Sequence, residues 1–200
     1  MRALVVLAAL ITLVPAAVSA KGPKAANQAA VTCTQVTNLK EVKLKRGIND
    51  LDGTPGEAGL KVLWLRKEGN FVPENYNAYV VFLGSISQGG TIFRFKNPAT
   101  NEFEDTIRDN PYDGEMHIRS VAFAHGTCNK INSVFLVSAT KILGSGPAEA
   151  TKVAFEIFGI HGDDYGFDAW FERVSARTSE QKYDSAEEAL IKEYGFSMGR

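Results

Sequence analysis

A short acidic segment has the residue types that come nearest to a metal site in this sequence. Asp50, Asp52, Thr54 and Gly56 alternate along the chain as the oxygen ligands of a calcium-binding loop do. An EF-hand needs a bidentate Glu at its twelfth loop position, and counting from Asp50 that position is Lys61. The glycines and the proline between the acids are typical of a turn. We therefore predict a strand connection, with Asp50 and Asp52 as the alternative metal ligands.

Ser138 and Lys141 reproduce the S-x-x-K spacing of serine β-lactamases and penicillin-binding proteins. In those enzymes a helical turn brings the Ser and the Lys together. Here the pair lies in "SVFLVSATKIL", a β-branched run, and residues three apart in a strand face opposite sides. The spacing recurs at Ser179 and Lys182, and the partner motifs S-D-N and K-T-G do not occur in the sequence. We interpret both matches as chance and expect a non-enzymatic protein without a cofactor.

The three histidines do not form a zinc-hydrolase pattern such as H-x-H or H-E-x-x-H. We expect His117 to be a surface strand residue and His125 a turn residue. A metal site shared by His125 and Cys128 would compete with a disulfide for the cysteine.

The segment "HGDDYGFDAWFE" is a candidate for ligand binding. If Ala169 and Phe171 point from a strand into the protein core, then Trp170 and Glu172 lie on the other face of that strand with Asp168. An outward aromatic ring flanked by carboxylates would form a ligand platform. The favoured alternative is that a second layer, such as a helix, covers Trp170.

The N-terminus predicts export. Residues 1–20 carry one charge, Arg2, before the apolar run "ALVVLAALITLVPAAV" and small residues at a cleavage position. This layout is that of a secretory signal peptide, and the run is too short for a stable membrane span. We expect residues 21–30 to be a disordered lead-in and residues 31–200 to form a single β-rich domain. The protein would be periplasmic or secreted, with no membrane span after cleavage.

Composition excludes one class of partner. The 22 Lys and Arg residues nearly balance the 23 Asp and Glu residues, so the formal net charge is −1. Such a balance gives no electrostatic footprint for nucleic acid or acidic lipid.

The two cysteines, Cys33 and Cys128, predict a disulfide. In an exported chain thiols tend to be oxidised, and a single pair has a single connectivity. Free or metal-bound thiols are the alternative, but neither cysteine has a close C-x-x-C partner.

Most of the chain after residue 30 predicts strands, because runs rich in Val, Ile, Thr and aromatic residues alternate with turn clusters. In one run Val153, Phe155 and Ile157 alternate with polar neighbours, which is typical of a strand with one wet face. Two such sheets packed together would make an antiparallel β-sandwich, and the fold class is mainly β. The predicted strands span residues 31–36, 40–45, 60–67, 76–83, 91–96, 115–123, 131–143, 150–160 and 166–176.

The C-terminal segment "YDSAEEALIKEYGF" predicts a short helix of about ten residues docked on the sandwich. Asp184 or Ser185 can cap its start, and Gly195 can end it. The expected apolar stripe consists of Ala189, Leu190, Ile191 and Tyr194.

Three parts of the chain together resemble a known family. These are "LKRGINDLD" with "GLKVLWLRKEGNF" and "YNAYVVFL", then "SVFLVSATKILG" with "ATKVAFEIFGI", and finally "FERVSARTSEQKYDSAEEALIKEYGF". They are similar to the carbapenem self-resistance proteins of the CarG type. The resemblance implies an exported protein that protects a bacterium from a carbapenem, without hydrolysing it, by binding the drug or shielding its targets. It also implies that Cys33 replaces a cysteine of the family's closing segment as the partner of Cys128.

Polar residues at strand ends would then carry recognition, and Arg66 could pair with the carboxylate of a β-lactam ligand. The full set is Arg66, Glu68, Asn70, Asn75 and Asn77. Solvated hairpin residues are the alternative interpretation of each.

Two other functions stay open. One is a periplasmic binding or interaction module for a glycan, a peptide or another envelope component, in which Trp170 matters more. The other is a hydrolase whose site is assembled from residues far apart in the sequence.

Overall fold

A computed structural model describes the protein over residues 33, 35–52, 59–67, 76–85, 89–109, 117–144, 146, 148–162 and 169–198. The expected signal peptide and lead-in lie outside these residues. The described part forms strands and one helix, and none of its helices is long and apolar enough to cross a membrane.

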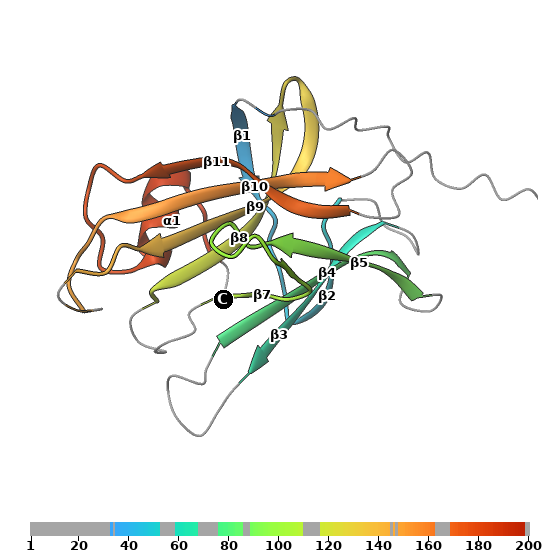
Figure 1. Ribbon diagram of the computed structural model, residues 1–200, viewed down its shortest axis with the longest axis horizontal. Coiled ribbons are helices and arrows are strands. Elements are labelled where there is room, and N and C mark those ends of the chain that lie inside the picture. Colours follow the sequence, from blue (N-terminus) through green and yellow to red (C-terminus); the bar gives the residue numbers. More distant parts are fainter. Residues whose placement is uncertain are drawn as a thin grey trace, which may run out of the picture.

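The elements follow in this order (Figure 1): β1 (Val36–Glu41), β2 (Gly47–Asp50), β3 (Leu60–Lys67), β4 (Tyr76–Ser85), β5 (Gly89–Lys96), β6 (Phe103–Glu104), β7 (Ile107–Arg108), β8 (Arg119–Cys128), β9 (Ile131–Lys141), β10 (Val153–Gly162), β11 (Ala169–Thr178) and α1 (Ala186–Tyr194).

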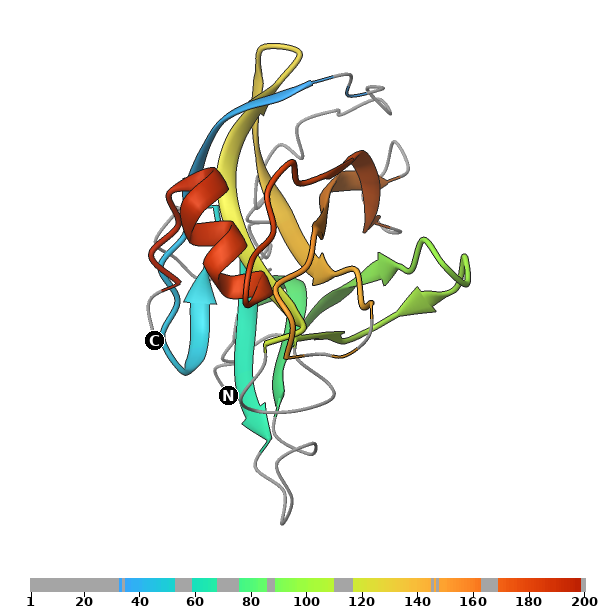
Figure 2. The same cartoon turned by 90° about the vertical axis from the view of Figure 1, so that its left-hand side faces the viewer.

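One sheet contains all the strands. Its order is β1-β8-β9-β10-β11-β5-β4-β3-β2, with β6 beside β5 and β7 beside β4. Neighbouring strands are antiparallel except β11 and β5, which run parallel with Trp170 opposite Arg94 and Phe171 opposite Phe95. The sheet curls into a half-barrel (Figures 1 and 2).

The prediction of a mainly β fold with a short C-terminal helix is confirmed, but the structure is not clearly an antiparallel sandwich. Alternation along a strand reports that one face is buried. Such alternation does not show whether a second sheet or the same sheet, curled over itself, covers that face. In this protein the same sheet curls over itself.

The concave face of the half-barrel encloses the main core. Aromatic rings from the two halves of the sheet meet edge to face there, with 4.8 Å between the ring centroids of Phe95 and Phe158 and 6.3 Å between those of Phe93 and Phe171. Burying each such side chain stabilises the fold by roughly 1.5–3 kcal/mol. Other members of this core are Val62, Val81, Val121, Phe123 and Leu136.

The helix covers part of the convex face. Residues that alternate with those of the main core, such as Ala122, Phe135 and Phe155, form a second core with Ala189 and Leu190 of α1. The helix packs mainly against β8 and β9 (Figure 2). These strands are therefore buried on both faces.

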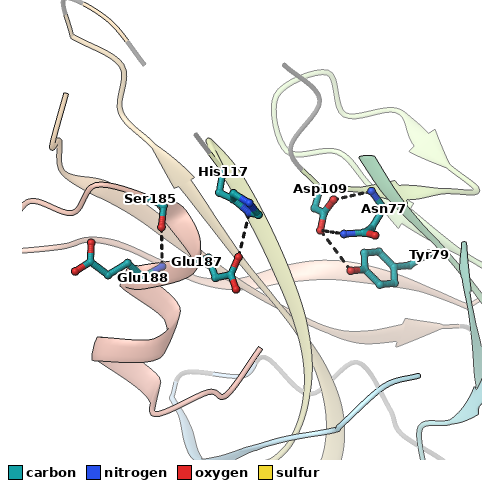
Figure 3. A network of polar contacts seen from close by, with 7 residues as sticks. All are labelled: Asn77, Tyr79, Asp109, His117, Ser185, Glu187 and Glu188. Atoms are coloured by element: carbon teal, nitrogen blue, oxygen red, sulfur yellow. Dashed lines mark hydrogen bonds and ion pairs between the residues drawn. The ribbon is translucent and has the colours of Figure 1, made fainter. Parts of the chain in front are cut away.

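The ends of α1 follow the predicted signals. Ser185 is the N-cap, and its Oγ accepts the backbone N–H of Glu188 at 2.9 Å (Figure 3). Gly195 ends the helix at φ 71°, where its N–H donates to the carbonyl of Ile191. The predicted stripe is correct for Ala189 and Leu190 but wrong for Ile191, which is 41% exposed.

The disulfide joins Cys33 to Cys128 at the end of β8, with 5.7 Å between the two Cα atoms. The cysteines are 95 residues apart in the sequence. The bond ties the segment before β1 to β8, beside the register pair Val36 and Cys128. It closes a long loop and so restricts the unfolded chain.

Replacing Cys128 with Ser should lower the melting temperature under oxidising conditions. Loss of the loop constraint is worth about 4 kcal/mol, or on the order of 10 °C. Differential scanning calorimetry checks this, and the wild type with a reductant should melt like Cys128→Ser. An unchanged melting curve would show that the bond does not stabilise the fold.

Candidate functional site

The acidic segment connects β2 to β3. Asp50 is opposite Lys61 in the antiparallel register and forms an ion pair with its ammonium group. The Oδ2 atom of Asp52 accepts the backbone N–H of Leu60 at 3.0 Å. A Cβ at position 59 would lie only 2.6 Å from this carboxylate oxygen, so Gly59 permits the contact. In the described ranges, no three metal-ligating side chains come together.

The polar residues proposed for recognition divide into two groups. Arg66 lies in β3 opposite Asn77, but its side chain, like Glu68, Asn70 and Asn75, lies outside what the structure describes. Asn77 is only 7% exposed. It is therefore not a solvated hairpin residue, and its amide is occupied by hydrogen bonds within the fold.

Asp109, directly after β7, is the centre of this hydrogen-bond network (Figure 3). Its carboxylate is 1% exposed and accepts the backbone N–H and the Nδ2 of Asn77, each at 2.8 Å. The hydroxyl of Tyr79 donates to the same carboxylate at 3.4 Å. The indole N–H of Trp64 donates to the Asn77 Oδ1 at 3.1 Å. The network fixes β7 on β4 from inside the barrel.

Asp109 could not be identified from the sequence because it lies in a run of polar turn residues. Its partner Asn77 is 32 residues away, so no local pattern identifies the pair.

Aromatic residues beside this network line a small pocket. Trp64 stacks on Tyr79 with 6.3 Å between ring centroids, and Phe123 meets Tyr79 edge to face. The pocket has a volume of about 40 Å³. Sites for drug-sized ligands usually span about 300–1,000 Å³. This pocket is therefore the size of a water site.

The histidines lie at three separate places. His117 precedes β8, and its Nδ1 lies 3.0 Å from Glu187 Oε2 of α1 (Figure 3). His125 was predicted in a turn but lies within β8, because that strand continues to Cys128. His161 lies in β10 opposite Trp170.

Trp170 is the centre of a second group on the convex face. Its ring centroid lies 4.5 Å from that of His161 and 5.5 Å from that of Phe103. The guanidinium carbon of Arg94 lies 4.3 Å from the Phe103 ring centroid. We call Arg94, Phe103, His161 and Trp170 the outer aromatic cluster. Side chains of the same sheet pack against Trp170, whereas the helix packs mainly on β8 and β9.

Apolar side chains extend the outer aromatic cluster across the neighbouring strands. Phe82 of β4 is opposite Ile92 of β5, and Ile92 shares a face with Arg94. Ile92 is 45% exposed and Phe103 is 42% exposed. The convex face where β5 meets β11 thus presents aromatic and apolar side chains to solvent.

Glu172 adds a charged group to this surface. Lys96 Nζ donates to its Oε1 at 2.7 Å, and His161 Nδ1 lies 3.6 Å from its Oε2. The hydrogen bond from Lys96 lowers the pKa of Glu172, and the electrostatic interactions with Lys96 and His161 lower it further against the effect of burial. The carboxylate beside Trp170 is therefore ionised at neutral pH.

Replacing Asp109 with Ala should destabilise the fold by about 3 kcal/mol. The substitution leaves the buried amide of Asn77 and the hydroxyl of Tyr79 without their acceptor. Urea unfolding measures the loss, with Asp105→Ala as the control because Asp105 is exposed. Equal losses from both variants would contradict a structural role for the network.

Replacing Lys96 with Met should raise the pKa of Glu172 toward its ordinary value. The pKa of Glu172 is depressed in the folded protein, so its pair with Lys96 stabilises the fold at pH values above the pKa that Glu172 has in the unfolded chain. This stability is lost as the pH falls through the pKa of Glu172 in the folded protein. A carboxyl NMR titration checks this, with the exposed Lys152→Met as control. An unshifted Glu172 titration in Lys96→Met would contradict the assignment.

Comparisons with known proteins report on the fold. No family model matches the chain, and no curated protein matches it. Among solved structures, the fold is similar to the crystal structure of CarG, with a TM-score of 0.58 and 20% sequence identity. The likeness covers 77% of this chain and 95% of that chain. The half-barrel with its C-terminal helix is thus a CarG-like fold.

Proposed function

We propose that this chain is an exported, non-enzymatic protein that protects a bacterium from carbapenem antibiotics, either by binding the drug or by shielding its targets. The observation that carries the proposal is the fold likeness to CarG, which spans 95% of that protein. The sequence resemblance to carbapenem self-resistance proteins points the same way. A fold hosts many functions, so activity must be tested directly.

The placement of Ser138 and Lys141 supports a non-enzymatic role. Ser138 alternates with Leu136 of the concave core, whereas the Lys141 ammonium donates to the Asp184 carbonyl before α1 at 2.6 Å. The two side chains therefore face opposite sides of β9. A serine nucleophile with a lysine base needs both within hydrogen-bond reach.

Export is supported by the disulfide. Such bonds persist in oxidising compartments such as the periplasm and the cell exterior. The proposed location is therefore the periplasm or the medium.

The outer aromatic cluster favours a second candidate function, an interaction module for an envelope component. Exposed aromatic residues with an adjacent arginine are enriched at protein interfaces. The same surface would also suit a protein that shields a drug target, because an envelope interaction module and a target shield both depend on contact with a large partner.

The test is the minimum inhibitory concentration of a carbapenem for a sensitive Gram-negative strain that carries the protein. We expect a rise that requires residues 1–20, with the drug intact in the medium by chromatography. The matched control is the chain without residues 1–20, which would remain in the cytoplasm.

An unchanged inhibitory concentration would contradict protection and leave the envelope module. Loss of the drug from the medium would instead indicate a hydrolase. Binding of the protein to isolated envelope fractions, weakened by Trp170→Ala, would support the module.

A further inference from the structure

Arg119 is a charged residue on the concave face of the half-barrel. It begins β8 and alternates with Val121 and Phe123, which belong to the concave core. Its guanidinium carbon lies 5.9 Å from the ring centroid of Phe95. Its Nε atom is buried and has no hydrogen-bond partner among the described residues. Among the residues that the structure describes, no carboxylate forms an ion pair with this guanidinium.

Three carboxylates lie close enough to act on Arg119 through their charge, namely Glu104, Glu156 and Asp109. Burial nevertheless lowers the pKa of Arg119, and this effect exceeds the opposing effect of the three acids. Each acid accepts a hydrogen bond from another residue. The donors are Asn97 to Glu104 at 2.7 Å, Arg173 to Glu156 at 2.8 Å and Asn77 to Asp109 at 2.8 Å.

Ser138 is a second unsatisfied group on the same face. It is 1% exposed, and within the described part of the chain its Oγ has no hydrogen-bond partner. In the antiparallel register Val121 is opposite Ser138 and Arg119 is opposite Thr140, so Arg119 and Ser138 are diagonal neighbours. Such neighbours have Cβ atoms roughly 7 Å apart, within reach of an arginine side chain. Buried polar atoms in folded proteins nearly always have a partner, and water or a ligand can supply it.

We propose that Arg119 and Ser138 form a binding site for a small zwitterion, a molecule that carries both a carboxylate and a protonated amine. The guanidinium fork binds the ligand carboxylate through two hydrogen bonds. The Ser138 hydroxyl donates a further hydrogen bond to a carboxylate oxygen. The ligand amine lies toward Glu104 and Glu156.

The surrounding acids explain why the ligand is a zwitterion and not a simple anion. A bare carboxylate would gain one attraction, from Arg119, and would be repelled by three neighbouring negative charges. A protonated amine on the same molecule turns that repulsion into attraction. The ligand class includes amino-acid-like molecules and carbapenems with a basic side chain. The carbapenem case rests on the proposed function.

The test is an NMR titration of the Nε–H signal of Arg119 in the full mature chain. Meropenem, which has a carboxylate and a protonated pyrrolidine, and diglycine are the zwitterionic probes, and acetate is the anion control. We expect a saturable shift with at least one zwitterion and at least tenfold weaker binding of acetate. Binding of all three with equal affinity would overturn the zwitterion assignment.

Two variants separate binding from stability. Arg119→Lys keeps the charge but loses the fork, and we expect it to weaken zwitterion binding about tenfold. Arg177→Lys is the matched control, because Arg177 pairs with Glu193 of the helix. Ser138→Ala removes a hydroxyl that has no partner among the residues that the structure describes, so the melting temperature of this variant should not fall while its affinity drops several-fold.

The proposal is overturned if neither zwitterion gives a saturable shift, or if both Arg119→Lys and Ser138→Ala bind the probe as the wild type does. The cellular assay keeps this proposal separate from the proposed function. Carbapenem protection that is unchanged in Arg119→Lys would contradict the carbapenem case and leave protection standing. Diglycine binding at Arg119 without any cellular protection would support the site and contradict protection.

Discussion

The parallel pairing of β11 with β5 joins the two halves of this molecule. Each half is an antiparallel set of strands, and the register that places Trp170 opposite Arg94 and Phe171 opposite Phe95 makes them one sheet. Side chains alternate along a strand, so the same few residues serve both faces. Phe95 and Phe171 enter the concave core, whereas Arg94 and Trp170 build the outer aromatic cluster.

The sheet curves where these two halves join. This curvature determines which polar groups are buried and therefore need hydrogen-bond partners inside the protein. Most of the concave side is buried, and a polar group placed there needs a partner from the chain, from a bound water or from a ligand. Asp109 meets this requirement through Asn77 and Tyr79. Arg119 and Ser138 leave atoms without a partner. This contrast within one core is the reason for assigning a ligand to the second pair and a structural role to the first.

Local patterns in the sequence predicted local structure. The alternation of Val153, Phe155 and Ile157 identified a strand, and all three are buried as predicted. The Ser185 cap and the Gly195 stop placed the helix. The single cysteine pair identified the disulfide, because two cysteines allow one connectivity.

Arrangements that depend on distant residues were not predictable in the same way. The junction of β11 with β5 joins segments separated by several strands, so periodicity carries no signal for it. Asn77 was expected among exposed polar residues, whereas Asp109 holds it inside the barrel. Trp170 was correctly placed on the face opposite Phe171, but its neighbours Phe103 and His161 come from other strands. Arg119 was not predicted as a site residue, because a single arginine in a strand belongs to no recognisable motif.

The two candidate surfaces differ in the partner that each can hold. In the outer aromatic cluster Phe103 is exposed while Arg94, His161 and Trp170 are half-buried, and a largely aromatic surface of that kind suits contact with a macromolecule. The Arg119 site lies on the concave face and offers charge and directed hydrogen bonds, which suit a small ligand. They lie on opposite faces of the β5–β11 junction and share no side chain. Substitutions at distant, independent sites are expected to act independently, so a change in the outer aromatic cluster should leave the Arg119 site unaffected, and the reverse.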